Sequence, residues 1–185
     1  MDPEVIEALY RASQAGVKIR LLVRGVCCLR AKVPGVSDNI IVRSIVGRFL
    51  EHSRIYYFEN AGDPSVYLSS ADWMPRNFFR RIEVAFPIET PALRDQIIND
   101  VIPTFLHDRV KARELQPDGT YRRLQPEGPE PRRQAQWQFR EVSRERTKKL
   151  TGSKKKPRAD KLIPISVVHQ ESTAAAPTSE KPFTA

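Results

Sequence analysis

The sequence predicts an α/β fold for residues 1–125 and a separate basic tail for residues 126–185. Segments with the apolar spacing of helices alternate with strand-like segments in the first part, so we expect a mixed β-sheet flanked by helices. Turn signals rich in Pro, Gly and Asp separate these segments. Beyond Gln125, prolines and basic residues dominate and apolar residues are few. Such a segment cannot bury enough surface to order itself, so the tail is predicted to be largely disordered.

The first elements are a helix and two strands. Asp2 can cap a helix that has Pro3 at its first position and ends at Gly16. Residues 17–23 alternate and then become wholly apolar, as in a strand that enters a buried sheet. Residues 40–46 are apolar enough to pack internally, and residues 48–51 have a short helical pattern, although strand and helix stay open there.

The later elements are strands, a helix and a closing hairpin. Residues 55–58 and 66–68 predict an antiparallel hairpin, and residues 82–86 alternate as a further strand. Thr90 can cap a helix that Pro103 should kink or end. Residues 112–116 and 120–124 flank a Pro-Asp-Gly turn and predict a final hairpin, and a helix from 132 to 150 is compatible with the pattern.

Charge and cysteine content limit the class of protein. The net charge is +9, with 18 Lys and Arg against 15 Asp and Glu in residues 1–125, and 13 against 7 in residues 126–185. The balance favours binding of polyanions, and the tail should bind them nonspecifically. The adjacent Cys27 and Cys28 have neither metal-ligand nor redox spacing, so we expect two small buried residues in a reducing compartment. No stretch has the ~20 apolar residues of a membrane helix and the start is unlike a signal peptide, which predicts a cytoplasmic protein.

One constellation suggests chemistry on phosphate. His52, Arg54 and Glu59 have the spacing His-x-Arg-x4-Glu within the segment HSRIYYFEN. On a strand, positions i and i+2 share a face, so His52 and Arg54 would point the same way. An imidazole can accept or donate a proton or attack phosphorus, while a guanidinium holds phosphate oxygens in a bidentate fork.

This spacing resembles the His-x-Lys-x4-Asp motif of the phospholipase D superfamily, with Arg for Lys and Glu for Asp. Ser69-Ser70-Ala71-Asp72 lies where that superfamily has a Gly-Ser-x-Asn element. Together with LLVRGVCCL, PGVSDNIIVRSIVGRFLEHSRIYYFEN and VYLSSADWMPRNFFRRIEVAFPI, these motifs resemble the C-terminal domain of bacterial polyphosphate kinases. Those enzymes move the terminal phosphate of ATP to and from inorganic polyphosphate. The resemblance runs from about residue 6 to residue 124 and implies a phospholipase D-like sandwich.

The resemblance also implies roles for individual residues. Arg24 and His52 correspond to the family's contacts with the ATP phosphates, with His52 as the catalytic residue, and Arg81 corresponds to a further phosphate ligand. We expect four more residues to support them by orienting His52 or a phosphate: Arg54, Asp72, Arg76 and Asn77. Lys32 is expected to be a solvated charge, His107 to lie at a helix end and His169 to be inert in the tail.

The chain also departs from the family. Polyphosphate kinases have an N-terminal domain, a helical head domain and a first phospholipase D-like domain with the histidine that becomes phosphorylated. None of these is in the sequence, which predicts a truncated or split chain. ATP is expected as a substrate, whereas the Mg²⁺ ligands are expected outside this chain, so we predict no metal site.

Three hypotheses follow. The first is a partial polyphosphate kinase that binds ATP and polyphosphate, needs the missing N-terminal domains and is inactive alone. The second is a phospholipase D-type phosphodiesterase that dimerises, a homo-oligomer in which one histidine attacks and its partner protonates the leaving group. Arg54 in place of lysine counts against it. The third is a noncatalytic module that binds polyanions through the tail.

Overall fold

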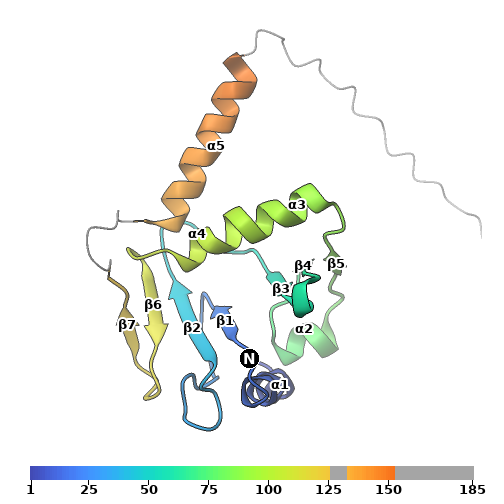
Figure 1. The fold of residues 1–185 in the computed structure, drawn as a ribbon, viewed down its shortest axis with the longest axis vertical. Coiled ribbons are helices and arrows are strands. Elements are labelled where there is room, and N and C mark those ends of the chain that lie inside the picture. Colours follow the sequence, from blue (N-terminus) through green and yellow to red (C-terminus); the bar gives the residue numbers. More distant parts are fainter. Residues whose placement is uncertain (126–132, 153–185) are drawn as a thin grey trace, which may run out of the picture.

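The computed structural model describes residues 1–125 and 133–152, and it has two sheets with helices around them (Figure 1). A four-stranded mixed sheet has the order β1-β2-β6-β7, and a three-stranded antiparallel sheet has the order β3-β4-β5. The predicted α/β class with mixed strands and flanking helices is therefore confirmed. The strands form two separate sheets, since none of the strands β3, β4 and β5 pairs with a strand of the four-stranded sheet.

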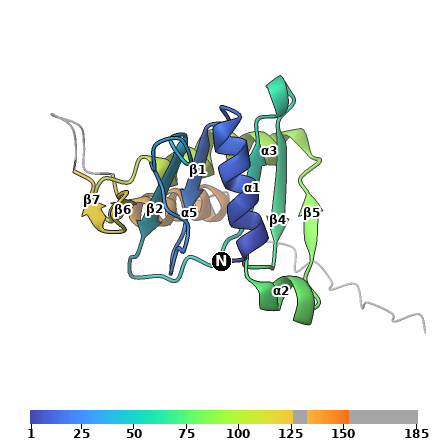
Figure 2. The same cartoon turned by 90° about the horizontal axis from the view of Figure 1, so that it is seen from below.

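Helix α1 (Pro3–Gln14) begins and ends where the sequence predicts. The Asp2 carboxylate accepts hydrogen bonds from the backbone N–H groups of Glu4 (3.0 Å) and Val5 (3.2 Å). Gly16 ends the helix with a φ of +88°, a conformation that favours glycine. Seen from below, α1 lies in front of both sheets (Figure 2). The Asp2 N–H donates to the Trp73 carbonyl oxygen (2.9 Å) after β4, and Asn39 Nδ2 donates to the Ser13 carbonyl oxygen (2.9 Å) before β2. This helix therefore joins the two halves of the fold.

The four-stranded sheet holds the best-buried core. Its strands are β1 (Ile19–Leu22), β2 (Ile40–Ile45), β6 (Ala112–Leu115) and β7 (Tyr121–Arg123). β1 and β2 are parallel, so both chains leave the sheet at the same end, while β6 and β7 form the predicted hairpin. Leu29, Ala31, Ile40, Val42 and Leu115 form the buried cluster.

The second sheet is more exposed. It contains β3 (Ile55–Phe58), β4 (Ser65–Ser69) and β5 (Ala85–Pro87), with the short helix η1 (Asn60–Gly62) in the predicted hairpin. The strand predicted at residues 82–86 was placed too early. Ile82 has a fully exposed side chain. The Val84 carbonyl still accepts from the Ser70 N–H (2.9 Å), but the Val84 N–H donates to the Ser70 hydroxyl instead of to the backbone of β4. Alternation of apolar residues alone does not distinguish a strand from an exposed segment that precedes the strand.

The remaining helices lie at both ends of the molecule, the first of them near α1 and the others at the opposite end (Figure 1). They are α2 (Pro75–Arg80), α3 (Pro91–Gln96), the π-helical turn η2 (Ile97–Val101), α4 (Ile102–Leu106) and α5 (Ala135–Gly152). The π-helical turn lies immediately before Pro103, which has no N–H to donate, so the helix is interrupted without ending. The ring of Phe139 in α5 packs on Phe105 in α4, with centroids 4.9 Å apart. The compatible helix from 132 to 150 is therefore confirmed as α5.

Three local predictions need correction. Residues 48–51 are neither helix nor strand, and they form a loop held by α5. Cys27 is half-buried and Cys28 is exposed, because the chain has left β1 before this pair and runs as a loop. Lys32 is not a solvated charge, since its ammonium group lies 2.5 Å from the Glu114 carboxylate.

Two further predictions concern the ends of the chain. His107 lies directly after α4, at the helix end that the sequence predicts. His169 and the predicted disorder of the tail beyond residue 152 lie outside the described residues. None of the helices in the described part is both long and apolar enough to cross a membrane.

Candidate functional site

The candidate site lies where the two parallel strands end. Arg24 follows β1, and the loop after β2 leads to His52. Because parallel strands present their carboxyl ends at one edge of a sheet, these two loops meet there. β4 contributes Asp72 through the segment that follows it. Three elements distant in sequence therefore bring charged groups together.

Arg54 is the centre of this group. Its Nε lies 3.0 Å from Asp72 Oδ1, and its Nη1 lies 3.0 Å from both the His52 ring Nδ1 and the His52 carbonyl oxygen. Arg24 Nη2 lies 3.6 Å from the same Asp72 oxygen, and Arg24 Nη1 donates to the Glu51 carbonyl oxygen at 2.5 Å. We call Arg24, His52, Arg54 and Asp72 the arginine–histidine cluster. Its members are predicted site residues that the fold does bring together.

The contact with Arg54 decides which nitrogen of His52 carries a proton. A guanidinium donates hydrogen bonds and cannot accept them, so the His52 Nδ1 must be the acceptor. In the neutral ring the hydrogen then lies on Nε2. His52 is exposed, so this N–H can donate to a bound anion. The lone pair that a nucleophile would use is directed at Arg54.

A second group of side chains adjoins the cluster. Glu83 accepts hydrogen bonds from the Ser70 hydroxyl and from Asn77 Nδ2, the latter at 2.5 Å. These two hydrogen bonds hold the pKa of Glu83 below its usual range, and the bond from Ser70 has the larger effect. The charges of Arg81 and Arg54 lower this pKa further. Asn77 is buried, with 4% of its surface exposed. Asn77 therefore orients Glu83 and does not contact His52.

The two remaining predicted residues, Arg76 and Arg81, are exposed. Arg76 lies close enough to Asp72 to help lower the pKa of that carboxyl group. Arg81 is beside Glu83 at the end of α2, with neither an ion pair nor a side-chain hydrogen bond within the described part of the chain. Arg24, Arg54, Arg76 and Arg81 thus outnumber the carboxylates of Asp72 and Glu83. An anion would be attracted to this region.

Comparison with known proteins identifies the family. The family model described as "Polyphosphate kinase C-terminal domain 2" matches residues 1–136. The chain belongs to this polyphosphate kinase family. The resemblance that the sequence motifs suggested is therefore confirmed.

Individual relatives agree with the family match. The chain is 60% identical to a polyphosphate kinase of Pseudomonas aeruginosa over 127 residues, which are 69% of this chain and 18% of the relative. It is 56% identical to a polyphosphate kinase of Xylella fastidiosa over 126 residues, 68% of this chain and 18% of the relative. The crystal structure of polyphosphate kinase from Porphyromonas gingivalis superposes with a TM-score of 0.74 at 41% identity, covering 80% of this chain and 22% of the other. The chain thus spans 18% of the length of these two curated polyphosphate kinases.

In this polyphosphate kinase domain, the first turn of α5 holds the loop that leads to His52. The Gln136 amide accepts from the Phe49 N–H (3.1 Å) and donates to the Phe49 carbonyl (2.7 Å) and to a Glu51 carboxylate oxygen (2.6 Å). Gln136 is 7% exposed, and a Cβ at Gly47 would lie 2.3 Å from its amide oxygen. Sequence reasoning missed both Gln136 and Glu83. Trp137, Phe139 and Val142 gave this helix some apolar character, but nothing in the pattern predicted a polar contact.

Mg²⁺ is the metal that the kinase family implies. Within residues 1–125 and 133–152, no three His, Cys, Asp or Glu side chains are grouped so that they could hold a metal ion. Asp72 and Glu83 are each engaged by donors of this chain. The described residues do not fit a metal site, and no step is derived through one.

The arginine–histidine cluster should make stability depend on pH through Asp72. The hydrogen bond from Arg54 is the main cause that lowers the pKa of Asp72. A carboxyl group with a lowered folded pKa stabilises the protein above its unfolded pKa of about 3.9, and this contribution is lost as the pH falls through the folded value. We expect Asp72→Asn to lower the free energy of unfolding by about 1 kcal/mol at pH 7, a value reduced for partial exposure.

Urea unfolding of both proteins at pH 7, 5 and 3 measures this effect. The difference between them should persist at pH 5 and shrink at pH 3, since the other carboxyl groups titrate in both proteins. A difference that is the same at all three pH values would contradict the role given to Asp72.

Proposed function

We propose that this chain is the part of a polyphosphate kinase that holds the phosphate groups of ATP and of polyphosphate, and that it is inactive without the rest of the enzyme. The observation that carries the proposal is the convergence of Arg24, Arg54 and His52 around Asp72. Relatives named polyphosphate kinase support the substrates.

The chemistry of the cluster suits this role. Arginines bind phosphate oxygens through several fixed donors, and these interactions are strong where solvent is partly excluded. The Arg54 side chain has 15% of its surface exposed and that of Arg24 has 32%, so both are partly desolvated. The Nε2–H of His52 adds a donor beside them. On this proposal His52 is catalytic by contacting the reacting phosphate as a hydrogen-bond donor, and Arg81 is a further phosphate ligand at the rim.

The proposal divides the work between parts of the enzyme. A histidine of another domain attacks the γ-phosphorus of ATP, and the ligands of Mg²⁺ also lie outside this chain. Asp72 and Asn77 position the arginines and Glu83, while Arg76 adds positive charge. We also propose that the domain is phospholipase D-like, that its sheets end near residue 125 with α5 packed against them, that the tail beyond α5 binds polyanions nonspecifically, and that the protein is cytoplasmic.

Binding of polyphosphate by the full chain tests the proposal. Titration calorimetry at low and at moderate salt should give a Kd that rises with salt, because arginines that engage a polyanion displace its counterions. Arg24→Ala and Arg81→Ala should each weaken the binding that survives moderate salt, by about tenfold for the loss of one charged contact. Neutralising Lys154, Lys155 and Lys156 should weaken binding mainly at low salt.

The matched control is Arg11→Ala. Arg11 is an exposed arginine of α1 that pairs with Glu7 at 3.8 Å, and its removal changes the net charge by the same amount. Its Kd should equal that of the unchanged chain at moderate salt. If Arg24→Ala and Arg81→Ala both match this control while their unfolding midpoints are unchanged, the phosphate-site assignment is wrong.

A further inference from the structure

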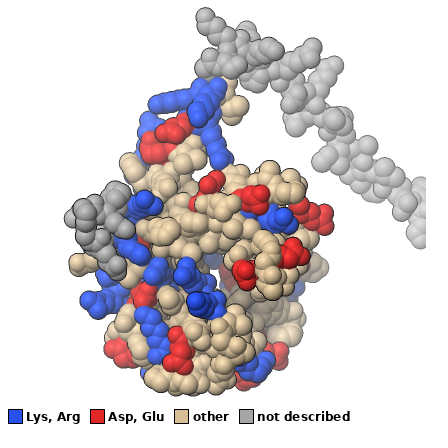
Figure 3. Space-filling model, viewed as in Figure 1, with Lys and Arg blue, Asp and Glu red and all other residues tan. Residues whose placement is uncertain are grey.

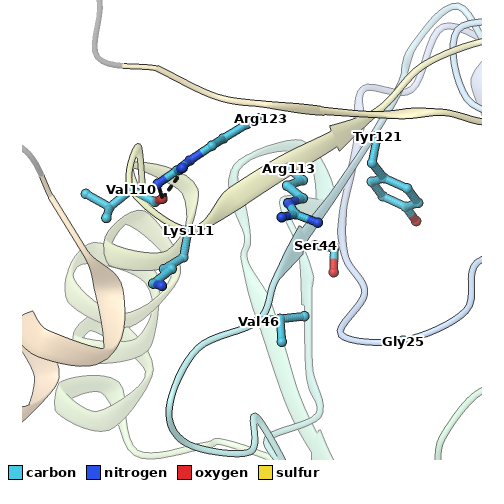
Figure 4. Close-up of a pocket in the computed structure, with 8 residues that line it drawn as sticks. All are labelled: Gly25, Ser44, Val46, Val110, Lys111, Arg113, Tyr121 and Arg123. Atoms are coloured by element: carbon cyan, nitrogen blue, oxygen red, sulfur yellow. Dashed lines mark hydrogen bonds between the residues drawn. The ribbon is translucent and has the colours of Figure 1, made fainter.

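A basic pocket lies on the four-stranded sheet, next to the arginine–histidine cluster. It has a volume of about 390 Å³, and Figure 4 shows the side chains of β2, β6 and β7 around it. Its lining comprises Gly25, Ser44, Val46, Val110, Lys111, Arg113, Tyr121 and Arg123. Gly25 adjoins Arg24 in the chain, so the pocket and the cluster border the same loop. The volume lies in the range of small-molecule sites, roughly 300–1,000 Å³.

The sheet register explains why cations gather here. Ser44 pairs with Arg113, and Arg113 pairs with Arg123, so these three residues of adjacent strands share one face. Lys111 and Tyr121 lie two residues from Arg113 and Arg123, and therefore face the same way. Figure 3 shows Lys and Arg side chains gathered over this half of the molecule.

Within the part of the chain that the structure describes, no carboxylate pairs with the cations of the pocket. Its lining contains three cations and no carboxylate, and none of the three forms an ion pair with the residues that the structure describes. Arg113 and Arg123 are directly opposite each other, an arrangement in which like charges destabilise a sheet. On the other face of the same strand, Glu114 forms ion pairs with both Lys32 and Arg43. Among the described residues, a carboxylate therefore pairs with the cations on one face of β6, and none pairs with those on the other face.

The donors of the pocket are also oriented. Arg123 donates to the Val110 carbonyl through Nε (3.2 Å) and Nη2 (2.8 Å), and Figure 4 shows this contact holding the side chain along β6. The Arg113 guanidinium lies beside the Ser44 hydroxyl in the same view. The Tyr121 hydroxyl is a further donor, because a tyrosine is protonated near neutral pH and partial burial raises its pKa further. A ligand that accepts hydrogen bonds and carries several negative charges fits these groups.

We propose that this pocket is a second anion site that binds the phosphates of a linear polyphosphate chain away from the reacting end. The inference rests on the proposed function, because it assigns the pocket to the same substrate. A chain that reaches from the arginine–histidine cluster past Gly25 contacts both sites. The two sites then reinforce each other, since the second contact is intramolecular once the first has formed.

The test compares two double variants of the full chain. Lys111→Gln with Arg113→Gln removes two pocket cations, both on exposed side chains. Lys18→Gln with Arg122→Gln is the matched control, because both residues are exposed and the loss of charge is equal. Arg122 lies opposite Glu114 in the strand register, so it is on the other face of the hairpin from the pocket. Titrations use long-chain polyphosphate, inorganic tripolyphosphate and ATP, and amide NMR shifts report where each probe binds.

The pocket variant should weaken long-chain polyphosphate binding by at least about tenfold relative to the control, and lower the salt dependence by about one to two counterions. Amide shifts of Lys111, Arg113 and Tyr121 should appear with long-chain polyphosphate. ATP binding should change little, since a nucleotide triphosphate engages the cluster alone.

Two outcomes separate this proposal from the proposed function. If the pocket variant matches its control while Arg24→Ala still weakens binding, the pocket proposal is overturned and the cluster assignment stands. If the pocket variant weakens binding and Arg24→Ala does not, the pocket is an anion site but the proposed function fails. Loss of ATP and polyphosphate binding to the same extent would make the pocket a nucleotide site and overturn the assignment to a trailing chain.

Discussion

When the isolated chain is incubated with γ-labelled ATP and Mg²⁺, it is expected to acquire no acid-labile, base-stable label. Such a label is the chemical signature of a phosphohistidine. The expectation concerns all three histidines of the sequence, His52, His107 and His169. Denaturing gel electrophoresis after acid and after base treatment measures it.

The physical reason is which ring nitrogen of His52 carries the proton. A histidine that attacks phosphorus through Nε2 needs a hydrogen-bond acceptor at Nδ1, so that the proton lies there and the lone pair lies on Nε2. His52 has the donor Arg54 at 3.0 Å from Nδ1, which is the opposite arrangement. Transfer of a phosphoryl group also needs separate groups to attack and to neutralise charge. His52 is placed for the second task.

Two controls give this experiment its meaning. Adding the N-terminal portion of a related polyphosphate kinase should restore a label, and that label should map to the added portion. In an Arg54→Gln variant, the glutamine amide oxygen can accept from a protonated Nδ1, which would leave the lone pair on Nε2. This variant tests whether the position of the ring proton alone prevents His52 from attacking phosphorus. A stoichiometric label on His52 of the unchanged chain would overturn this account and favour the oligomeric phospholipase D-type hypothesis.

The sequence predicts the fold best where one local signal determines one element. Asp2, Pro3 and Gly16 define α1 because a cap, a rigid first residue and a left-handed terminator act locally. The turn at Gly119 has a φ of +87° and closes the β6–β7 hairpin for the same reason. The prediction of a strand at residues 82–84 was wrong, because a strand and an exposed segment can have the same apolar pattern. Pairing with β4, which begins only at Ala85, determines which of the two forms.

The candidate site was predicted residue by residue, but its connections were not. The motifs indicated Arg24, His52 and Asp72, whereas the hydrogen bonds to Arg54 depend on how β3 and β4 pair. Gln136 lies 85 residues from Glu51 in sequence, and no periodic pattern predicts a contact over that separation. Long-range polar contacts of this kind depend on the packed fold and are invisible to local rules.

Asp108 is a further residue that local patterns did not reveal. It is fully buried between α4 and β6. Its Oδ1 accepts from the N–H groups of Val110 (2.8 Å), Lys111 (2.6 Å) and Ala112 (3.2 Å), and its Oδ2 accepts from Ala135 N–H at the start of α5 (2.8 Å). One carboxylate thus pairs four backbone donors and joins α5 to the four-stranded sheet.

Asp108→Ala is therefore expected to lower the free energy of unfolding by on the order of 3–5 kcal/mol, because it leaves buried N–H groups without partners. Asp108→Asn keeps an oxygen for one set of donors, so we expect a smaller loss. Chemical denaturation followed by tryptophan fluorescence measures both, since Trp73 and Trp137 report on the two sides of the fold.

Asp118→Ala is the matched control for Asp108→Ala. Asp118 also accepts backbone and side-chain hydrogen bonds, from Thr120 N–H (2.9 Å) and Thr120 Oγ1 (2.7 Å), but it lies in an exposed turn where water can replace them. Its loss should cost no more than about 1 kcal/mol. Equal unfolding midpoints for the two alanine variants would show that Asp108 does not join α5 to the sheet in solution. A midpoint far lower for Asp108→Ala, with Asp108→Asn between them, would establish that α5 is part of the folded unit that presents His52.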